Sequence, residues 1–234
     1  MRAMASVTAV TIVALWLAAP RPVDVAMFGV VGVVAAIAIA LGLAAAGRFG
    51  RGAMLGGAAA VRPHGRGEAI GRLAGSGLLG FVLGAIILGI LIFALVPLEP
   101  ALATRLRSRA GDPAWMPVVL AFESSVLEEV VFRLFLLSCL VWLLRRGWRR
   151  DVQEAAPIAV WSAILVSSAA FGLAHLPSWL GVVQATPLLV GSVLALNGVA
   201  GVALGRVYWR WGFEAAVVCH FAADIAVQGI GPRL

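Results

Sequence analysis

Long apolar runs separated by short polar stretches dominate the chain. A bilayer core about 30 Å thick is crossed by a helix of about 20 apolar residues, so each of the long runs predicts one membrane-spanning helix. The runs cover approximately residues 4–20, 25–47, 73–97, 117–144, 158–176, 187–205 and 212–230. The pattern therefore predicts an all-α, polytopic transmembrane helix bundle of about seven spans.

Two segments leave the number of spans open. The stretch from Gly52 to Val61 is apolar but too short to cross unless it re-enters the membrane or lies on its surface, so an eighth span remains an alternative. The first run also resembles a signal peptide, because one early arginine precedes it. We favour a membrane helix there, because another long run follows almost at once, after the helix-breaking Pro20-Arg21-Pro22.

Composition supports a membrane protein: 62% of the residues are hydrophobic and 12% are charged, against about 45–50% and 25% in soluble domains. The net charge of +7 comes from 18 basic residues, all of them arginine. These cluster at the ends of apolar runs, so membrane topology explains them and nucleic acid is not an expected partner. Exclusive use of arginine with abundant Ala, Gly and Val is typical of a high-GC bacterial gene, which indicates a bacterial cytoplasmic membrane.

The arginines also predict an orientation. With seven spans, 12 arginines fall on the side of the N-terminus and 5 on the opposite side, while Arg133 lies inside a span. Because cytoplasmic loops carry an excess of basic residues, the N-terminus is predicted to be cytoplasmic and the C-terminus external. An even number of spans would reverse the C-terminal assignment.

The fourth run contains charged residues that the membrane should exclude: Glu123, Glu128, Glu129 and Arg133. Charges at membrane depth are costly, so each needs a partner, a watery cavity or a function. Glu129 and Arg133 are four residues apart, on one helix face, and predict an ion pair. Glu128 lies about 100° around the helix and lacks a local counter-charge, which makes it a candidate general base. The alternative is a purely structural ion-pair network, and Glu123 is expected to face the membrane interface.

Two histidines lie in other apolar runs. His175 follows Phe171 by four residues, and Pro177 is expected to end that helix. His220 and Asp224 are four residues apart and should share one helix face. A solitary histidine near a helix end would be interpreted as an interfacial hydrogen-bonding residue. Here two histidines lie at membrane depth together with carboxylates, so His175, His220 and Asp224 are candidate site residues.

The remaining polar and small residues receive structural interpretations. Ser124 and Ser125 are expected to be helix-packing hydroxyls, Asn197 an interhelical hydrogen-bonding group, and Cys139 and Cys219 small buried hydrophobes. His64, in a basic loop, is interpreted as incidental. Glycines four residues apart, Gly80 with Gly84 and Gly201 with Gly205, would allow helices to approach closely. The chain contains no His-Glu-x-x-His zinc helix, no Gly-x-Ser-x-Gly elbow, no phosphate loop and no Gly-x-Gly-x-x-Gly after a predicted strand.

Three ordered motifs together resemble those of the CPBP family of intramembrane proteases, which comprises type II CAAX prenyl endopeptidases and bacteriocin-processing or immunity proteins. The motifs are Glu128-Glu129-x-x-x-Arg133, Phe171-x-x-x-His175 and His220-x-x-x-Asp224. The resemblance implies that Glu128 activates the attacking water and that His175 assists or orients it. Phe171 and the pair formed by Glu129 and Arg133 would support them.

For the third motif the resemblance leaves two roles open, stabilisation of the oxyanion or binding of a metal. A divalent ion such as zinc would be held by Glu128, His175 and His220, although no pair of these residues has a familiar zinc spacing. Asp224 stands where many relatives have Asn. An acid there fits orientation of His220 better than donation to an oxyanion.

The resemblance covers residues 116–234, which are expected to form the catalytic helix core, while residues 1–115 are expected to form variable N-terminal membrane helices of the same domain. It implies an endopeptidase that hydrolyses a peptide bond of a membrane-associated substrate, CAAX-like or prenylated, in contact with membrane lipid. A non-catalytic immunity or scaffold protein of the same fold is one alternative. A transporter or proton relay is another, because intramembrane carboxylates and histidines also mark ion pathways.

Overall fold

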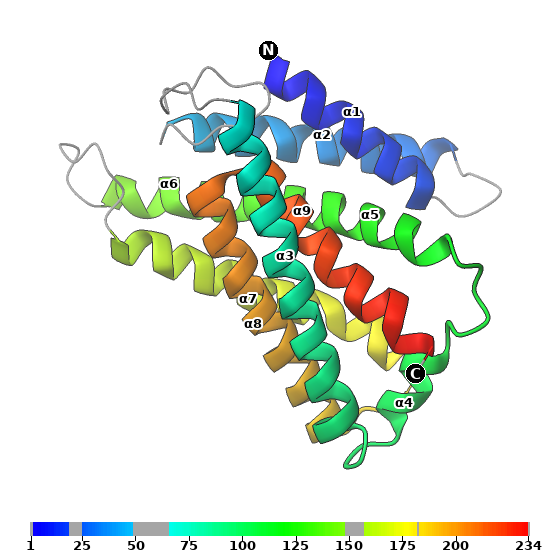
Figure 1. Ribbon diagram of the computed structural model, residues 1–234. Coiled ribbons are helices and arrows are strands. Elements are labelled where there is room, and N and C mark those ends of the chain that lie inside the picture. The colour runs from blue at the N-terminus through cyan, green and yellow to red at the C-terminus, as the bar shows by residue number, and fades with distance from the viewer. Residues whose placement is uncertain (1, 19–24, 49–65, 148–156, 182, 234) are drawn as a thin grey trace.

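The computed structural model describes residues 2–18, 25–48, 66–147, 157–181 and 183–233 (Figure 1). These ranges contain helices and short connections and no β-strand, which confirms the predicted all-α class. In chain order the helices are α1 (Arg2–Ala18), α2 (Val25–Gly47), α3 (Arg66–Ile90), η1 (Leu91–Leu95), α4 (Ala101–Arg107), α5 (Met116–Glu128), η2 (Glu129–Leu137), α6 (Ser138–Gly147), α7 (Pro157–Leu180), α8 (Pro187–Trp211), α9 (Phe213–Asp224), η3 (Ile225–Ile230) and η4 (Gly231–Arg233).

Five helical segments within the described ranges are long and apolar enough to cross a membrane: Gly29–Gly47, Gly67–Leu95, Pro157–Leu180, Pro187–Trp211 and Phe213–Arg233. A shorter apolar helix, Met4–Leu17, lies within α1. The continuous helix α5–η2–α6 is long enough as well but carries the intramembrane charges. Together, the five long segments, the shorter apolar helix and the helix α5–η2–α6 agree roughly with the seven predicted spans. The possible eighth span, the Pro20–Pro22 turn and His64 lie outside the described residues.

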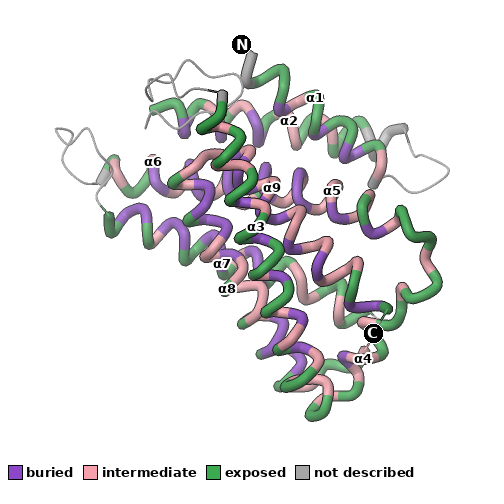
Figure 2. Tube along the Cα trace, viewed as in Figure 1, coloured by how far each residue is buried: buried purple, intermediate pink, exposed green. Residues whose placement is uncertain are grey.

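Helix α5–η2–α6 runs through the middle of the bundle (Figure 1). It contacts α1 and α2 on one side and α7 and α9 on the other, while α3 packs along α9 and α7 packs along α8. Buried residues face the centre where these helices meet, and exposed residues face outward (Figure 2). Many of the exposed residues are large and apolar, including Val30, Leu78 and Leu165. Such a surface is suited to contact with lipid tails.

The paired glycines permit the close helix contacts predicted for them. A Cβ atom at Gly80 or Gly84 would collide with backbone atoms of Cys219 or Ala223 on α9, and one at Gly201 would lie 2.9 Å from the Cβ of Ser168 on α7. The absence of side chains thus lets α3 touch the backbone of α9, the helix that carries His220 and Asp224.

Several helix ends differ from the prediction, and the start of α3 lies at Arg66, before the predicted residue 73. Helix α7 does not end at Pro177 but continues to Leu180, with the proline inside its last turn. The ring removes one amide hydrogen bond, yet the amide of Gly181 still bonds to the carbonyl of Pro177, so the turn closes. Helix α8 extends to Trp211, beyond the predicted residue 205. The short helix α4 was not predicted.

Candidate active site

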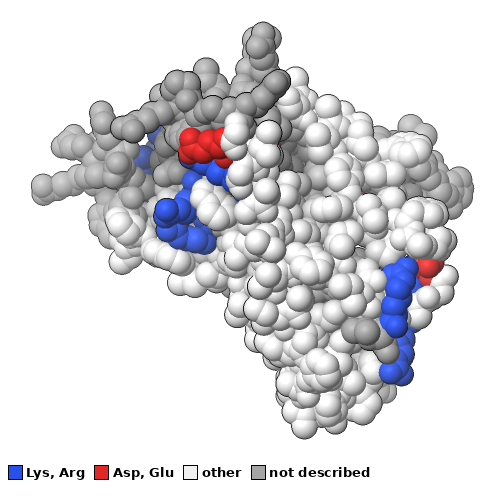
Figure 3. Space-filling view, in the orientation of Figure 1, with Lys and Arg blue, Asp and Glu red and all other residues white. Residues whose placement is uncertain are grey.

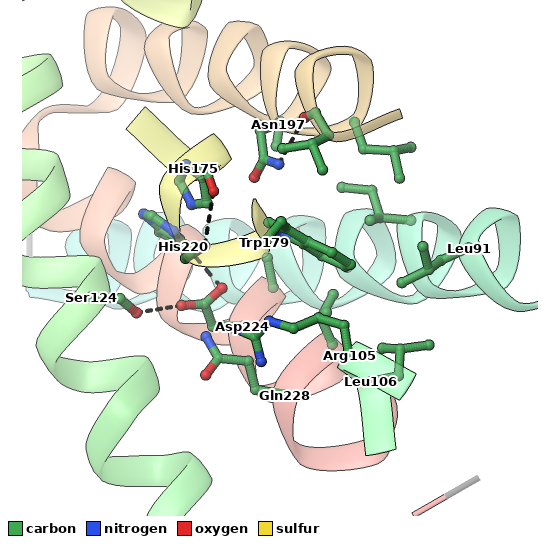
Figure 4. A pocket seen from close by; sticks show the side chains of 18 of the residues that line it. Leu91, Arg105, Leu106, Ser124, His175, Trp179, Asn197, His220, Asp224 and Gln228 are labelled. Carbon is green, nitrogen blue, oxygen red and sulfur yellow. Dashed lines mark hydrogen bonds and ion pairs between the residues drawn. The ribbon is translucent and has the colours of Figure 1, made fainter. Parts of the chain in front are cut away.

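The site residues predicted from three separate parts of the sequence meet at one cavity of about 470 Å³. Glu128 ends α5, His175 lies on α7, and His220 and Asp224 lie on α9. Figure 4 shows His175, His220 and Asp224 directed into this cavity from their two helices. The bundle therefore brings together in space four polar residues that are spread over about a hundred positions of sequence.

Glu128 and Glu129 lie where α5 changes to the π-helical segment η2. π-Helical turns are rare and occur frequently at functional sites. The Glu128 side chain is 27% exposed and lines the cavity, whereas that of Glu129 is fully buried. The two adjacent carboxylates thus occupy different environments. This agrees with the sequence prediction, in which adjacent residues of a helix point in directions about 100° apart.

Glu129 forms the predicted ion pair with Arg133 in the protein interior. The Oε1 atom of Glu129 lies 3.4 Å from Nη1 of Arg133, and neither side chain is more than 1% exposed. The guanidinium also donates from Nη2 to the carbonyl of Gly201 at 3.4 Å. Its central carbon lies 4.3 Å from the ring centroid of Phe171. Arg133 therefore joins η2 to both α7 and α8.

Glu129 has a second partner that the sequence did not indicate. Its Oε1 atom lies 3.0 Å from Nδ1 of His220, a residue 91 positions away. A carboxylate paired with an arginine accepts hydrogen bonds, so the Nδ1 atom of His220 carries the hydrogen. The Nε2 atom of the same ring consequently faces the cavity. No spacing in the sequence could have shown this contact, because it joins two distant helices.

His175 is held in the same manner by its own helix. Its Nδ1 atom lies 2.8 Å from the carbonyl oxygen of Phe171, which can only accept, so Nδ1 carries the hydrogen here too. The ring of Phe171 also packs against both imidazoles, with centroids 4.5 Å from His175 and 5.7 Å from His220. Phe171 thus contacts both histidines, as a supporting residue would.

The Nε2 atoms of the two histidines converge on one carboxylate oxygen. Each lies 3.7 Å from Oε2 of Glu128. This oxygen is buried and has no hydrogen-bond partner among the described residues. When the histidines are neutral, their two Nε2 atoms and Oε2 of Glu128 are all hydrogen-bond acceptors, and these three atoms surround a single point. A group that donates hydrogen bonds is therefore needed between them.

Asp224 lies beside this point and is held by a residue with a predicted packing role. Its Oδ2 atom accepts a hydrogen bond from the hydroxyl of Ser124 on α5, 100 residues away. Its Oδ1 atom is 3.9 Å from Nε2 of His220. Ser124 thus belongs to the site, and its position beside the acidic patch was the one signal for this. Ser125 instead donates to the carbonyl of Phe122 in its own helix, at 3.0 Å.

Two further expectations are corrected. Glu123 is partly buried and lines the cavity beside Ser124 on α5, so it does not simply face the membrane interface. Asn197 also lines the cavity, and its amide donates to the carbonyl of Val193 at 2.8 Å within α8. The predicted interhelical bond is replaced by the nearest carbonyl on the same helix, four residues back.

A metal site is not supported by the geometry. Across the described part of the chain, no three His, Cys, Asp or Glu side chains are arranged to hold a metal ion. The set formed by Glu128, His175 and His220 therefore stays an expectation from the sequence. The two cysteines are free thiols, with Cys219 buried and Cys139 partly exposed.

Comparison with protein families matches residues 110–226 to the family described as Rce1-like: Type II CAAX prenyl endopeptidase Rce1-like. Neither the curated proteins nor the solved structures include a match to this chain. The matched segment begins before α5 and ends just after α9, so it contains Glu128, His175, His220 and Asp224. The chain belongs to the Rce1-like family of type II CAAX prenyl endopeptidases, a family of membrane proteases.

Proposed function

We propose that this protein is an intramembrane endopeptidase in which Glu128 activates a water molecule for attack on a peptide bond. The observation that supports this most directly is the convergence of two imidazole Nε2 atoms on Oε2 of Glu128, at 3.7 Å each. A water molecule at that point would supply hydrogens to the carboxylate and to His175. A side chain that accepts a proton while holding water against a carbonyl is the requirement for general-base hydrolysis.

In the proposed reaction the water oxygen forms a bond with the carbonyl carbon while its proton passes to Glu128. Glu128 then returns this proton to the amide nitrogen as the carbon–nitrogen bond breaks. The two hydrogens of the water molecule can satisfy two acceptors, the carboxylate of Glu128 and the imidazole of His175. This leaves His220 as the third group at the site. As an imidazolium beside Glu129 and Asp224, His220 would donate from Nε2 to the negatively charged carbonyl oxygen.

The substrate class follows from the family and the surroundings of the site. A cavity among membrane-spanning helices suits a peptide that is itself anchored in lipid, and the family name indicates CAAX-type prenylated peptides. We therefore propose a CAAX-like or prenylated peptide as the first substrate to test. Residues 116–234 would form the catalytic core, residues 1–115 would form variable helices around it, and the protein would lie in a bacterial cytoplasmic membrane.

Replacement of Glu128 by Gln tests the proposal, because the amide keeps the shape of the side chain and removes the base. Cleavage of a prenylated CAAX-type peptide, followed by mass spectrometry in detergent micelles, should fall at least about 100-fold. Glu68→Gln is a suitable control, since Glu68 is an exposed carboxylate at the start of α3. Undiminished cleavage by Glu128→Gln protein of normal stability would refute the assignment.

Two further measurements separate the rival interpretations. A strong chelator should leave the activity of the wild-type protein unchanged if protein groups and water suffice, whereas its loss would point to a metal. A cellular phenotype that survives Glu128→Gln would favour a non-catalytic immunity or scaffold role. Substrate-dependent ion flux in proteoliposomes would favour a transporter.

A further inference from the structure

Besides Arg109, the lining of the cavity that holds the candidate catalytic residues includes a second basic residue, Arg105. This residue lies on α4, in the connection between two membrane-spanning segments. In Figure 4 its side chain points from α4 into the cavity, on the side of Asp224 and Gln228. The cavity thus has a cationic group in addition to the carboxylate and imidazole cluster.

Helix α4 is held firmly, so the position of Arg105 is defined by packing. Leu102 is fully buried and packs with Leu91, Leu189 and Val193. Just before α4, the carboxylate of Glu99 accepts a 2.5 Å hydrogen bond from Thr186, the residue that caps α8. A guanidinium on such a support is pre-oriented and loses little freedom on binding.

The guanidinium of Arg105 has contacts but, within the described residues, no anionic partner. It lies 5.6 Å from the ring centroid of Trp179 and donates from Nη1 to the hydroxyl of Ser108 at 3.2 Å. Its Nε atom is buried without a hydrogen-bond partner, and no described carboxylate forms an ion pair with it. Burial lowers the pKa of Arg105, and the positive charge of Arg109 lowers it further. An anion placed at this end of the cavity would offset both effects.

We propose that Arg105 binds a carboxylate of the substrate and thereby sets the position of the peptide relative to Glu128. An arginine with a buried, unpaired donor and an aromatic contact is well suited to planar recognition of a carboxylate. The carboxylate is either the C-terminus of the peptide or the side chain of an acidic residue. This inference rests on the proposed peptidase function, because the bound peptide is a substrate only if the protein cleaves it. Binding of the peptide can nevertheless be measured separately from cleavage.

Three hexapeptides distinguish these sources. Two share one apolar sequence, with a free C-terminal carboxylate in the first and a C-terminal amide in the second. The third is the same amide with the residue before its last replaced by Glu. Their affinities are measured in detergent with the Glu128→Gln protein, so that no turnover interferes. We expect one of the two carboxylate-bearing peptides to bind about 10- to 100-fold more tightly than the plain amide. Whichever does so identifies the source.

Adding Arg105→Gln should reduce that affinity to the level of the plain amide. Arg107→Gln is the matched control, because Arg107 is exposed on the same helix and does not line the cavity. Arg105→Lys should retain part of the preference, since it keeps the charge but not the planar fork. Equal binding of all three peptides, or a preference that survives Arg105→Gln, would overturn the proposal.

These results remain separable from the peptidase test. If the wild-type protein cleaved nothing but still preferred a carboxylate through Arg105, the peptidase function would fail and the binding site would stand. If it cleaved acid and amide peptides with equal KM and kcat, and bound them equally, the binding site would fail and the peptidase would stand. A poorly folded Arg105→Gln variant leaves the comparison of the three peptides as the deciding measurement.

Discussion

Arg133 is almost completely buried within a membrane bundle, and the residues around it account for its presence there. It contacts the carboxylate of Glu129, the carbonyl of Gly201 and the ring of Phe171, which belong to three different helices. A buried charge is stable when partners of this kind compensate for the loss of hydration. Because Glu129 also holds His220, the arginine acts on the site through a second residue.

Arg133→Ala should therefore destabilise the protein strongly. It removes the ion-pair partner of the buried carboxylate of Glu129, which keeps only its contact with His220. Breaking a buried ion pair typically costs about 3–5 kcal/mol. Unfolding followed in detergent by heat or denaturant should shift accordingly, and activity should fall with it. Arg107→Ala, at an exposed position on α4, should change stability by no more than about 0.5 kcal/mol. An Arg133→Ala protein that unfolds like the wild type would show that the pair has little structural importance.

At the scale of helices, the contact between α3 and α9 is the one that positions two site residues. Helix α9 carries His220 and Asp224, and its backbone at Cys219 and Ala223 lies directly against Gly80 and Gly84 of α3. The obstacle that a new methyl group would meet is backbone, so rotation of a side chain cannot relieve it. Any larger residue must move one helix away from the other.

Gly80→Ala should consequently lower stability by about 1–3 kcal/mol and reduce peptide cleavage by displacing α9. Gly77→Ala provides the control, because a Cβ atom there would make only an ordinary contact of 3.5 Å with Val218. Both changes add the same methyl group to the same helix, so propensity effects cancel between them. Equal stability and activity of the two variants would argue against close packing of α3 on α9.

At the scale of the whole molecule, the face drawn in Figure 3 carries its visible charged side chains in separate places, with a broad uncharged surface between them. This distribution suits a protein whose middle faces lipid and whose ends face water. The arginines predict the orientation across the membrane: with seven spans, 12 of them are expected on the side of the N-terminus and 5 on the other side.

An external C-terminus is therefore expected for seven spans. Alkaline phosphatase fused to the C-terminus in a bacterial host should be active, and a fluorescent protein fused there should remain dark, because each folds on only one side of the membrane. The reverse pair of results would indicate an even number of spans or the opposite orientation. An N-terminal fluorescent fusion, expected to be bright, separates these two explanations.

The sequence alone determined the features that depend on local spacing. Apolar runs of membrane length indicated the helices, and a four-residue separation paired Glu129 with Arg133 and placed His220 and Asp224 on one face. Glycine spacing likewise indicated close helix contacts. These predictions succeeded because the helix repeat relates residue number directly to direction in space.

Only the tertiary structure decided which groups meet between helices. The bond of Glu129 to His220 spans 91 positions, that of Ser124 to Asp224 spans 100, and Arg105 enters the cavity from a short helix that no apolar pattern marked. The position of Asn197 and the passage of α7 through Pro177 also depended on packing. Distances across a bundle depend on how helices cross and rotate against one another, and the repeat within a single helix carries no information about that.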